Sequence, residues 1–283
     1  MQNDENPFIM KPFHSFHLLI MGGIVFSILS CSIIEPPENS NPIDPLNPEF
    51  ELPEATITSH FDGQIVLQPD ITFKWKGRFT NSLYSFKLEG RDKSFSSWQN
   101  LQAATYNYID EGVYIFQVKE KLGEYEQTLP TSATITMDAL QQTSLIFVPW
   151  YQKITADTEG YMDLCLEEVV DFKGLTSKIS LGESITITRI EGNNTIIGND
   201  GGSWVLLTNS LDAMNADHLV AIDGVLLGGN PNGFSGSCPL CRIYFSAAGD
   251  GQLTTMPDST KIRNTANENI DIAVFRGALV VCQ

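Results

Sequence analysis

Short stretches in which apolar and polar residues alternate recur along most of this chain. Between residues 55 and 139, turn-forming residues separate them, and no stretch repeats its apolar residues at helical spacing. The pattern predicts strands at 55–59, 71–75, 84–88, 105–108, 113–119 and 133–137. Short strands at close spacing are typical of an antiparallel sandwich. We therefore expect residues 55–139 to form a first β-sandwich.

A second strand-rich region covers residues 142–283. Glycine-rich segments at 198–202 and 228–237 interrupt it. Its predicted strands lie at 144–148, 161–170, 184–190, 204–209, 218–227, 242–247 and 278–282. About 140 residues without a convincing amphipathic helix predict a larger, jelly-roll-like sandwich of about nine strands. The predicted fold class is therefore all-β, with two β-sandwich domains.

The apolar run at residues 18–30 differs from these strands. It holds about 13 residues, whereas a helix needs ~20 to span a bilayer, and its length suits the core of an export signal. The triplet Ile28-Leu29-Ser30 before Cys31 resembles the lipobox of bacterial lipoproteins, which implies that Cys31 carries lipid. Residues 1–30 are then a signal peptide, the alternatives being a non-cleaved membrane anchor or a chance apolar segment. Because acidic residues near the start are unusual in signals, we expect translation to begin at Met10.

Residues 31–54 follow with the lipidated cysteine and six prolines. Such a proline-rich segment predicts an extended, semi-rigid tether. The lipoprotein resemblance implies an exported protein that is lipid-anchored to the cell envelope. Ser32 after the cysteine resembles the sorting pattern for the outer membrane, so the expected location is the outer membrane or cell surface.

Charge narrows the classes of partner. The chain has a formal net charge of −17 and no cluster of lysine and arginine. Phosphate backbones are repelled by such a surface, so nucleic-acid binding is not expected. Attraction to anionic lipid is likewise not expected, so membrane attachment rests on the acyl chains.

Five cysteines are present. If Cys31 carries lipid, the remaining even number in an exported protein predicts two disulfides, with three connectivities open. The four candidates are Cys165, Cys238, Cys241 and Cys282. A redox role for the Cys238-x-x-Cys241 spacing needs a helix N-terminus, but a strand is predicted there. A zinc site, which needs four ligands, is a weaker alternative.

Catalytic motifs are missing from the sequence. After the signal, the histidines are His60 and His218, in different modules, and no nucleophile elbow, HExxH or phosphate loop is present. The carboxylate pairs Asp110-Glu111 and Glu167-Glu168 are neighbours in sequence, and neighbours on a strand point to opposite faces, so we interpret them as solvent-exposed charges. We expect no enzyme, no metal and no cofactor. The oxygen-rich loops at 199–202 and 258–269 leave calcium as an alternative, although neither has EF-hand spacing.

The first module contains the segment Tyr84-Ser-Phe-Lys-Leu-Glu-Gly, then Trp98, then Asp110-Glu-Gly-Val-Tyr-Ile-Phe-Gln-Val-Lys119. Together they resemble fibronectin type III-like and triple-tyrosine modules. The aromatic residues alternate with polar ones, which favours core packing over sugar stacking. These aromatics are Tyr84, Phe86, Trp98, Tyr114 and Phe116.

Five segments of the second module follow one another in the order Asp163–Gly174, Lys178–Leu181, Gly236–Ala247, Lys261–Asn264 and Gly277–Val281. In this order they resemble a cohesin domain, the sandwich that captures dockerin modules in cellulosomes. Cys238 and Cys241 depart from the family pattern, in which a small residue is usual. The resemblance also implies a sheet order in which Cys165 neighbours Cys241, leaving Cys238 for Cys282, or the two bonds exchanged.

Alternation along 203–209 and 217–223 predicts which side chains face outward. The outward set contains apolar residues among polar ones, which indicates an interaction surface. In cohesins the corresponding sheet receives the dockerin helices, which by resemblance gives the partner-binding candidates Val205, Leu207, Asn209, Leu219 and Asp223. The expected function is non-catalytic: binding a dockerin-like protein or anchoring polysaccharide-degrading proteins. The alternatives are a carbohydrate-binding module, which would need an exposed row from Trp150, Tyr151, Tyr161 and Trp204, or a structural component of a surface or secreted assembly.

Overall fold

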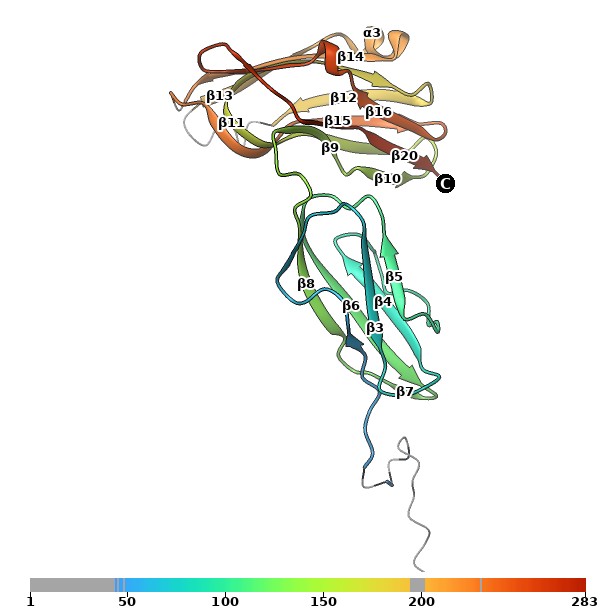
Figure 1. Ribbon diagram of the computed structural model, residues 1–283. Coiled ribbons are helices and arrows are strands. Elements are labelled where there is room, and N and C mark those ends of the chain that lie inside the picture. Colours follow the sequence, from blue (N-terminus) through green and yellow to red (C-terminus); the bar gives the residue numbers. More distant parts are fainter. Residues whose placement is uncertain (1–43, 45, 48, 194–201, 230) are drawn as a thin grey trace, which may run out of the picture. The chain divides into compact units, whose positions relative to one another are not determined.

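The computed structural model describes residues 44, 46–47, 49–193, 202–229 and 231–283 (Figure 1). The predicted signal peptide, Cys31 and most of the predicted tether lie outside these residues. The chain divides into one unit that ends at Leu52 and a second, Pro53–Gln283. In the first unit, the backbone carbonyl and carboxylate of Asp44 accept hydrogen bonds from the N–H groups of Asn47 and Leu46. No helix in the described part of the chain is long and apolar enough to cross a membrane.

Residues 56–137 form a β-sandwich of two sheets, as their alternation predicts. One sheet has the order β1-β3-β5, and the other has the order β2-β8-β6-β4 with β7 paired to β6. The strands are β1 (Thr56–Ile57), β2 (Gln64–Val66), β3 (Ile71–Lys76), β4 (Leu83–Glu89), β5 (Ala103–Tyr106), β6 (Gly112–Leu122), β7 (Tyr125–Glu126) and β8 (Thr131–Met137).

Aromatic side chains fill the core between these sheets. Phe73 of β3 stacks on Phe116 of β6 with ring centroids 4.1 Å apart, and Tyr84 is also fully buried. Phe86 and Tyr114 pack against this core, so the core interpretation is correct for four of the five aromatics. Trp98 is the exception: it lies half-buried outside the core, under the ammonium group of Lys121.

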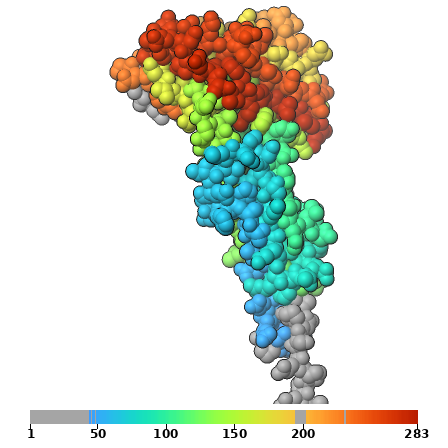
Figure 2. Space-filling view, in the orientation of Figure 1, coloured from blue at the N-terminus to red at the C-terminus, as the bar shows by residue number. Residues whose placement is uncertain are grey.

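Residues 144–282 form a second and larger sandwich with its own hydrophobic core. Figure 2 shows residues near the C-terminus, in red, covering one side of it. Its strands are β9 (Ser144–Val148), β10 (Tyr151–Ile154), β11 (Glu159–Leu181), β12 (Ile185–Gly192), β13 (Gly202–Thr208), β14 (Leu219–Gly228), β15 (Phe234–Ala247), β16 (Gly251–Thr255), β17 (Lys261–Asn264), β18 (Asn269–Ile270), β19 (Val274–Arg276) and β20 (Ala278–Cys282). A short 3-10 helix, η2 (Pro257–Ser259), precedes β17. The all-β prediction is therefore confirmed.

Strand β11 belongs to both layers of this sandwich. Its first half pairs with β9 and β15, whereas its second half pairs with β14 and β17. Between the halves the register with β15 shifts, and Glu168 and Asp171 have positive φ angles of 50° and 57°. Such irregularities bend a strand and let it cross from one sheet to the other. The predicted strand at 161–170 is thus too short.

A helix that the sequence did not predict lies between β13 and β14. It is α3 (Leu211–Asp217), and the Ser210 side chain caps it by accepting a hydrogen bond from the N–H of Ala213. His218 ends the helix in the left-handed conformation and donates its N–H to the carbonyl of Met214. The predicted strand at 218–227 therefore begins one residue later, at Leu219.

Candidate functional site

Four apolar side chains project into solvent from the neighbouring strands β13 and β14. Val205 and Leu207 are 36% and 66% exposed, and Val225 and Leu227 are 40% and 53% exposed. The register sets Val205 opposite Val225 and Ser203 opposite Leu227, so these side chains lie on one face of the sheet. We call these four residues the apolar strip. Contiguous exposed apolar side chains are typical of an interaction site.

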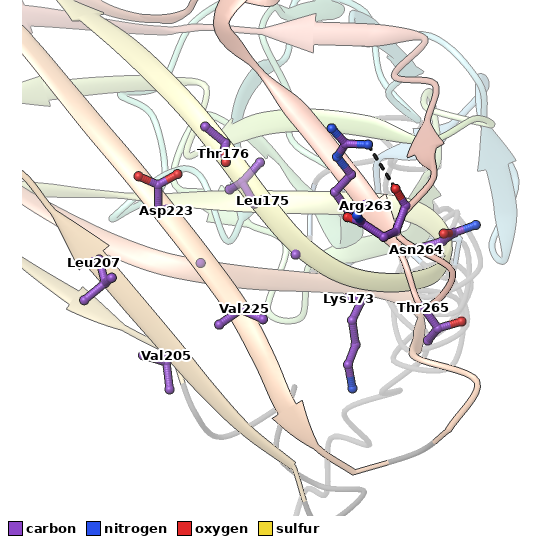
Figure 3. A pocket seen from close by; sticks show the side chains of 13 residues that line it. Lys173, Leu175, Thr176, Val205, Leu207, Asp223, Val225, Arg263, Asn264 and Thr265 are labelled. Carbon is purple, nitrogen blue, oxygen red and sulfur yellow. Dashed lines mark hydrogen bonds between the residues drawn. The ribbon is translucent and has the colours of Figure 1, made fainter.

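A hollow of about 320 Å³ lies beside the apolar strip (Figure 3). Val205, Leu207 and Val225 line it, together with the backbone of Gly174 and Gly224. On the core side of Gly224 the Trp204 ring is so close that an added Cβ would lie 2.2 Å from it. Trp204 therefore supports the sheet beneath the hollow, and the absent side chain of Gly224 makes room for its ring. Gly174 lies opposite the outward residues Val225 and Arg263, so it is the glycine that leaves the hollow free of a side chain.

The other half of the same face is cationic. Four basic residues, the cationic flank, lie at outward positions of β11 and β17: Lys173, Lys178, Lys261 and Arg263. Lys261 pairs with Thr176 across the strands, which makes it a diagonal neighbour of Lys178. Within the described residues, no member of the flank forms an ion pair with a carboxylate.

Two members of the flank are held by backbone carbonyls instead. Lys173 Nζ donates to the carbonyl of Gly228 at 3.0 Å, and Arg263 Nη1 donates to that of Asn267 at 3.0 Å. Asp223 is the carboxylate on this face, where it lies between Leu207 and Thr176 in the cross-strand row. We call the whole surface of β13, β14, β11 and β17, strip and flank together, the open face.

Three of the five partner-binding candidates lie together on the open face: Val205, Leu207 and Asp223 line the hollow. Asn209 does not, because its side chain ties the start of β14 to the end of β13. It accepts a hydrogen bond from the N–H of Ala221 and donates one to the carbonyl of Leu219. Leu219 itself is half-buried and does not line the hollow. The sequence reasoning missed Val225, Leu227 and the cationic flank.

The candidate catalytic groups do not assemble. His218 ends α3, and the ring of His60 packs edge-on against Phe73 at 5.4 Å. The Nδ1 atoms of both histidines have no hydrogen-bond partner among the described residues.

The pair Asp110-Glu111 differs from its prediction. It lies in a loop rather than a strand, and both side chains turn to Arg276, with N–O distances of 3.3 and 3.8 Å. The interpretation as two solvent-exposed charges on opposite faces is therefore wrong for this pair. Burial raises the pKa of both carboxyl groups, and the charge of Arg276 opposes that shift. Since Arg276 is itself buried, the three groups form an ion-pair cluster between the loop and β19.

The predicted disulfides are not present: the four described cysteines are free thiols. Cys282 Sγ lies 3.3 Å from the carbonyl oxygen of Ala247, at the far end of β15 from Cys238. Nine residues of strand separate Cys238 from Ala247, or about 30 Å at ~3.3 Å per residue. A bond between Cys238 and Cys282 is therefore wrong for this fold, and an exchange with Cys165, which lies opposite Pro239, fails for the same reason.

Cys165 and Cys241 lie closer together but do not face each other. The residue opposite Cys241 is Leu164, whose side chain is in the core, whereas Cys165 is not part of that core. Burial raises the pKa of the Cys165 thiol and raises those of Cys238 and Cys241 to about 12. All three are thus protonated, poorly nucleophilic thiols.

The aromatic row that a sugar-binding face would need is not formed by the four predicted residues. Trp204 is buried under the open face, and Trp150 packs against Arg276 and Tyr108. Tyr161 lies on a different strand face, where it pairs with Tyr244.

No group of three or more histidine, cysteine, aspartate or glutamate side chains in the described residues has metal-site geometry. Of the two oxygen-rich loops, 199–201 lies outside these residues. In the other loop, Asn264 hydrogen-bonds the backbone and side chain of Glu268, as a turn requires.

Comparison with known proteins gives structural similarity alone. No protein-family model matches the chain, and no curated protein matches it. Similar solved structures include a non-cellulosomal cohesin from the archaeon Archaeoglobus fulgidus, at 12% identity and a TM-score of 0.38, covering 50% of this chain and 93% of that one. A type I cohesin–dockerin complex from Clostridium thermocellum has 11% identity and a TM-score of 0.40, covering 50% and 100%. A type II cohesin from Acetivibrio cellulolyticus has 9% identity and a TM-score of 0.38, covering 49% and 95%.

Proposed function

We propose that the C-terminal sandwich is a non-catalytic docking module that holds a protein partner against its open face. One observation carries the proposal: the apolar strip lies exposed beside a hollow lined by the backbone of Gly174 and Gly224. The strands hold these side chains in place before binding, which lowers the conformational-entropy cost of binding. Aliphatic side chains favour a protein partner, since sugars stack on aromatic faces.

We propose more narrowly that the partner is dockerin-like. Support comes from the sequence resemblance of residues 163–174, 236–247 and 261–264 to cohesins. These segments belong to β11, β15 and β17, and β17 lies on the open face beside the second half of β11. In the Clostridium thermocellum structure it is that cohesin which binds a dockerin.

We also propose that Cys31 carries lipid and anchors the protein to the cell envelope, with the proline-rich segment as tether. Support is the apolar run that ends at a cysteine. Metabolic labelling with an alkynyl fatty acid tests it: the wild-type protein should incorporate the label and Cys31→Ser should not. Equal labelling of both would contradict the proposal.

Affinity capture with the whole chain tests the docking function. The bait variant is Leu207→Asp/Val225→Asp, which places two charges in the apolar strip. Its matched control is Leu101→Asp/Leu129→Asp, since both leucines are exposed on the first sandwich. We expect wild type and control to retain the same protein from the extracellular fraction of the producing organism, and the strip variant to lose it. Capture that does not depend on the strip, or no capture by wild type, would overturn the proposal.

A further inference from the structure

The cationic flank predicts the sign of the charge on the surface of the partner that docks here. We propose that the partner of the open face is a protein whose docking helix is amphipathic and acidic on one side, so that carboxylates meet the flank while an apolar ridge meets the strip. The inference rests on the proposed function and adds the chemistry that selects the partner.

The flank stands out against the charge of the whole chain. Residues 142–283 contain eight lysines and arginines in a protein of net charge −17. Three of the eight, Arg189, Arg242 and Arg276, are paired with carboxylates. Four of the remaining five form the flank and lack such a partner among the described residues. Cations left without carboxylates in a chain so rich in acid are available to carboxylates from outside.

The distance between the apolar strip and the cationic flank matches the width of an α-helix. Neighbouring strands lie ~4.8 Å apart, so the centre of the strip on β13–β14 and that of the flank on β11–β17 are about 10 Å apart. An α-helix with its side chains is about 10–12 Å wide. A single helix lying along the strands therefore touches the strip with one side and the flank with the other. A side chain of its apolar ridge meets the hollow, where Gly174, opposite Val225 and Arg263, contributes no side chain.

Two other anionic occupants fit less well. An acidic polysaccharide would use the flank but leave the aliphatic strip in water. A second copy of this chain would bring the net charge of −17 against another −17, with mutual repulsion outside the contact. A separate acidic helix satisfies both halves of the face.

Two helical peptides of about 20 residues, long enough to form helix, serve as probes. They share one ridge of leucines at helical spacing and differ in the flanking residues, all glutamate in one and all lysine in the other. Binding to the whole chain is followed by fluorescence anisotropy at low and high salt. The net charge of the protein alone predicts tighter binding of the lysine peptide, whereas the open face predicts tighter binding of the glutamate peptide.

We expect the glutamate peptide to bind at least about tenfold more tightly at low salt, with the preference reduced at high salt. Lys178→Glu/Lys261→Glu should abolish the preference. The matched control Lys74→Glu/Lys76→Glu changes the charge equally at two exposed positions of β3 and should retain it. Equal binding, a lysine preference, no binding of either peptide, or an unaffected Lys178→Glu/Lys261→Glu variant would overturn the inference.

Two further measurements distinguish an acidic helix from the two other occupants of the open face. Displacement of the glutamate peptide by polygalacturonate at lower concentration than by unlabelled peptide would assign the flank to a polysaccharide. Dimerisation of wild type that Lys178→Glu/Lys261→Glu abolishes would assign it to a second copy. If strip-dependent capture succeeds while the peptides show no charge preference, the docking function stands and this inference fails. If strip-dependent capture fails, the docking function fails, whatever the peptides show.

Discussion

The two outward faces of the C-terminal sandwich differ in whether their basic residues have carboxylate partners. On the layer of β12, β15 and the first half of β11, which we call the paired face, Arg242 donates from Nε and Nη2 to Asp163 at 2.7 and 2.8 Å and lies 4.0 Å from the Tyr161 ring centre. Arg189 lies 3.6 Å from the ring centre of Tyr244 and pairs with Glu159 and Glu191. On the open face, the described cations have no carboxylate partner.

The difference separates residues that serve the fold from residues left for a partner. A bidentate arginine–carboxylate pair stacked on an aromatic ring holds the guanidinium within the fold, and here it links β15 to β11. Hydrogen bonds with Asp163 also raise the pKa of Arg242. Lysines beside an apolar strip contribute little to folding, and their charge can act on a molecule that approaches. We therefore expect mutations on the paired face to change stability and mutations on the open face to change binding.

The largest change in stability is expected at Gly224, where the sheet of the open face packs against Trp204 in the core. Gly224→Ala places a methyl group against the Trp204 ring and should destabilise the protein by about 1–3 kcal/mol, because the core is overpacked. Gly192→Ala is the matched control, since its Cβ would meet Leu206 at an ordinary 3.4 Å. Urea unfolding of both variants measures the difference. Equal stability of the two would show that Trp204 does not support the floor of the hollow.

A smaller effect is expected on the paired face. Asp163→Ala removes the carboxylate that Arg242 contacts, with Arg242 itself 41% exposed, so the loss should be about 1 kcal/mol. Lys178→Ala on the open face should change the free energy of unfolding by no more than about 0.5 kcal/mol. Thermal unfolding of the two variants side by side checks the contrast. A larger loss from Lys178→Ala would reverse the distinction between the faces.

The smallest effect concerns Glu167, at the bend of β11 between the two faces. Burial raises its pKa, so the folded protein keeps this proton at pH values where the unfolded chain has lost it. Ionisation then costs stability as pH rises through the folded pKa, and the cost is complete above that pKa. Glu167→Gln, which can keep the hydrogen bond with Ser237, should match wild type at about pH 3 and exceed its stability at about pH 7. Melting curves across this range test it, and a variant less stable than wild type at pH 7 would contradict it.

Alternation predicted most of the longer strands and the outward direction of Val205 and Leu207, but it missed β2, β10 and β16. It failed at Asp217 and His218, because a helix of seven residues buries only Met214 and carries little periodic signal. The outward set predicted from Asp217 to Asp223 therefore contains Leu219, which does not line the hollow, and ends before Val225 and Leu227 on the same strand. The bend in β11 depends on positive φ at Glu168 and Asp171, which tertiary pairing imposes. The register that separates Cys238 from Cys282 likewise depends on the whole sheet.

The most direct test of a partner-binding open face compares both faces in one binding measurement. The captured partner is titrated against the wild-type chain, against Leu207→Asp/Val225→Asp on the open face, and against Tyr161→Ser/Tyr244→Ser on the paired face. We predict that the open-face variant loses at least about tenfold in affinity, which is 1.4 kcal/mol, while the paired-face variant binds as wild type does. Loss of affinity in the paired-face variant, with the open-face variant unchanged, would contradict the account.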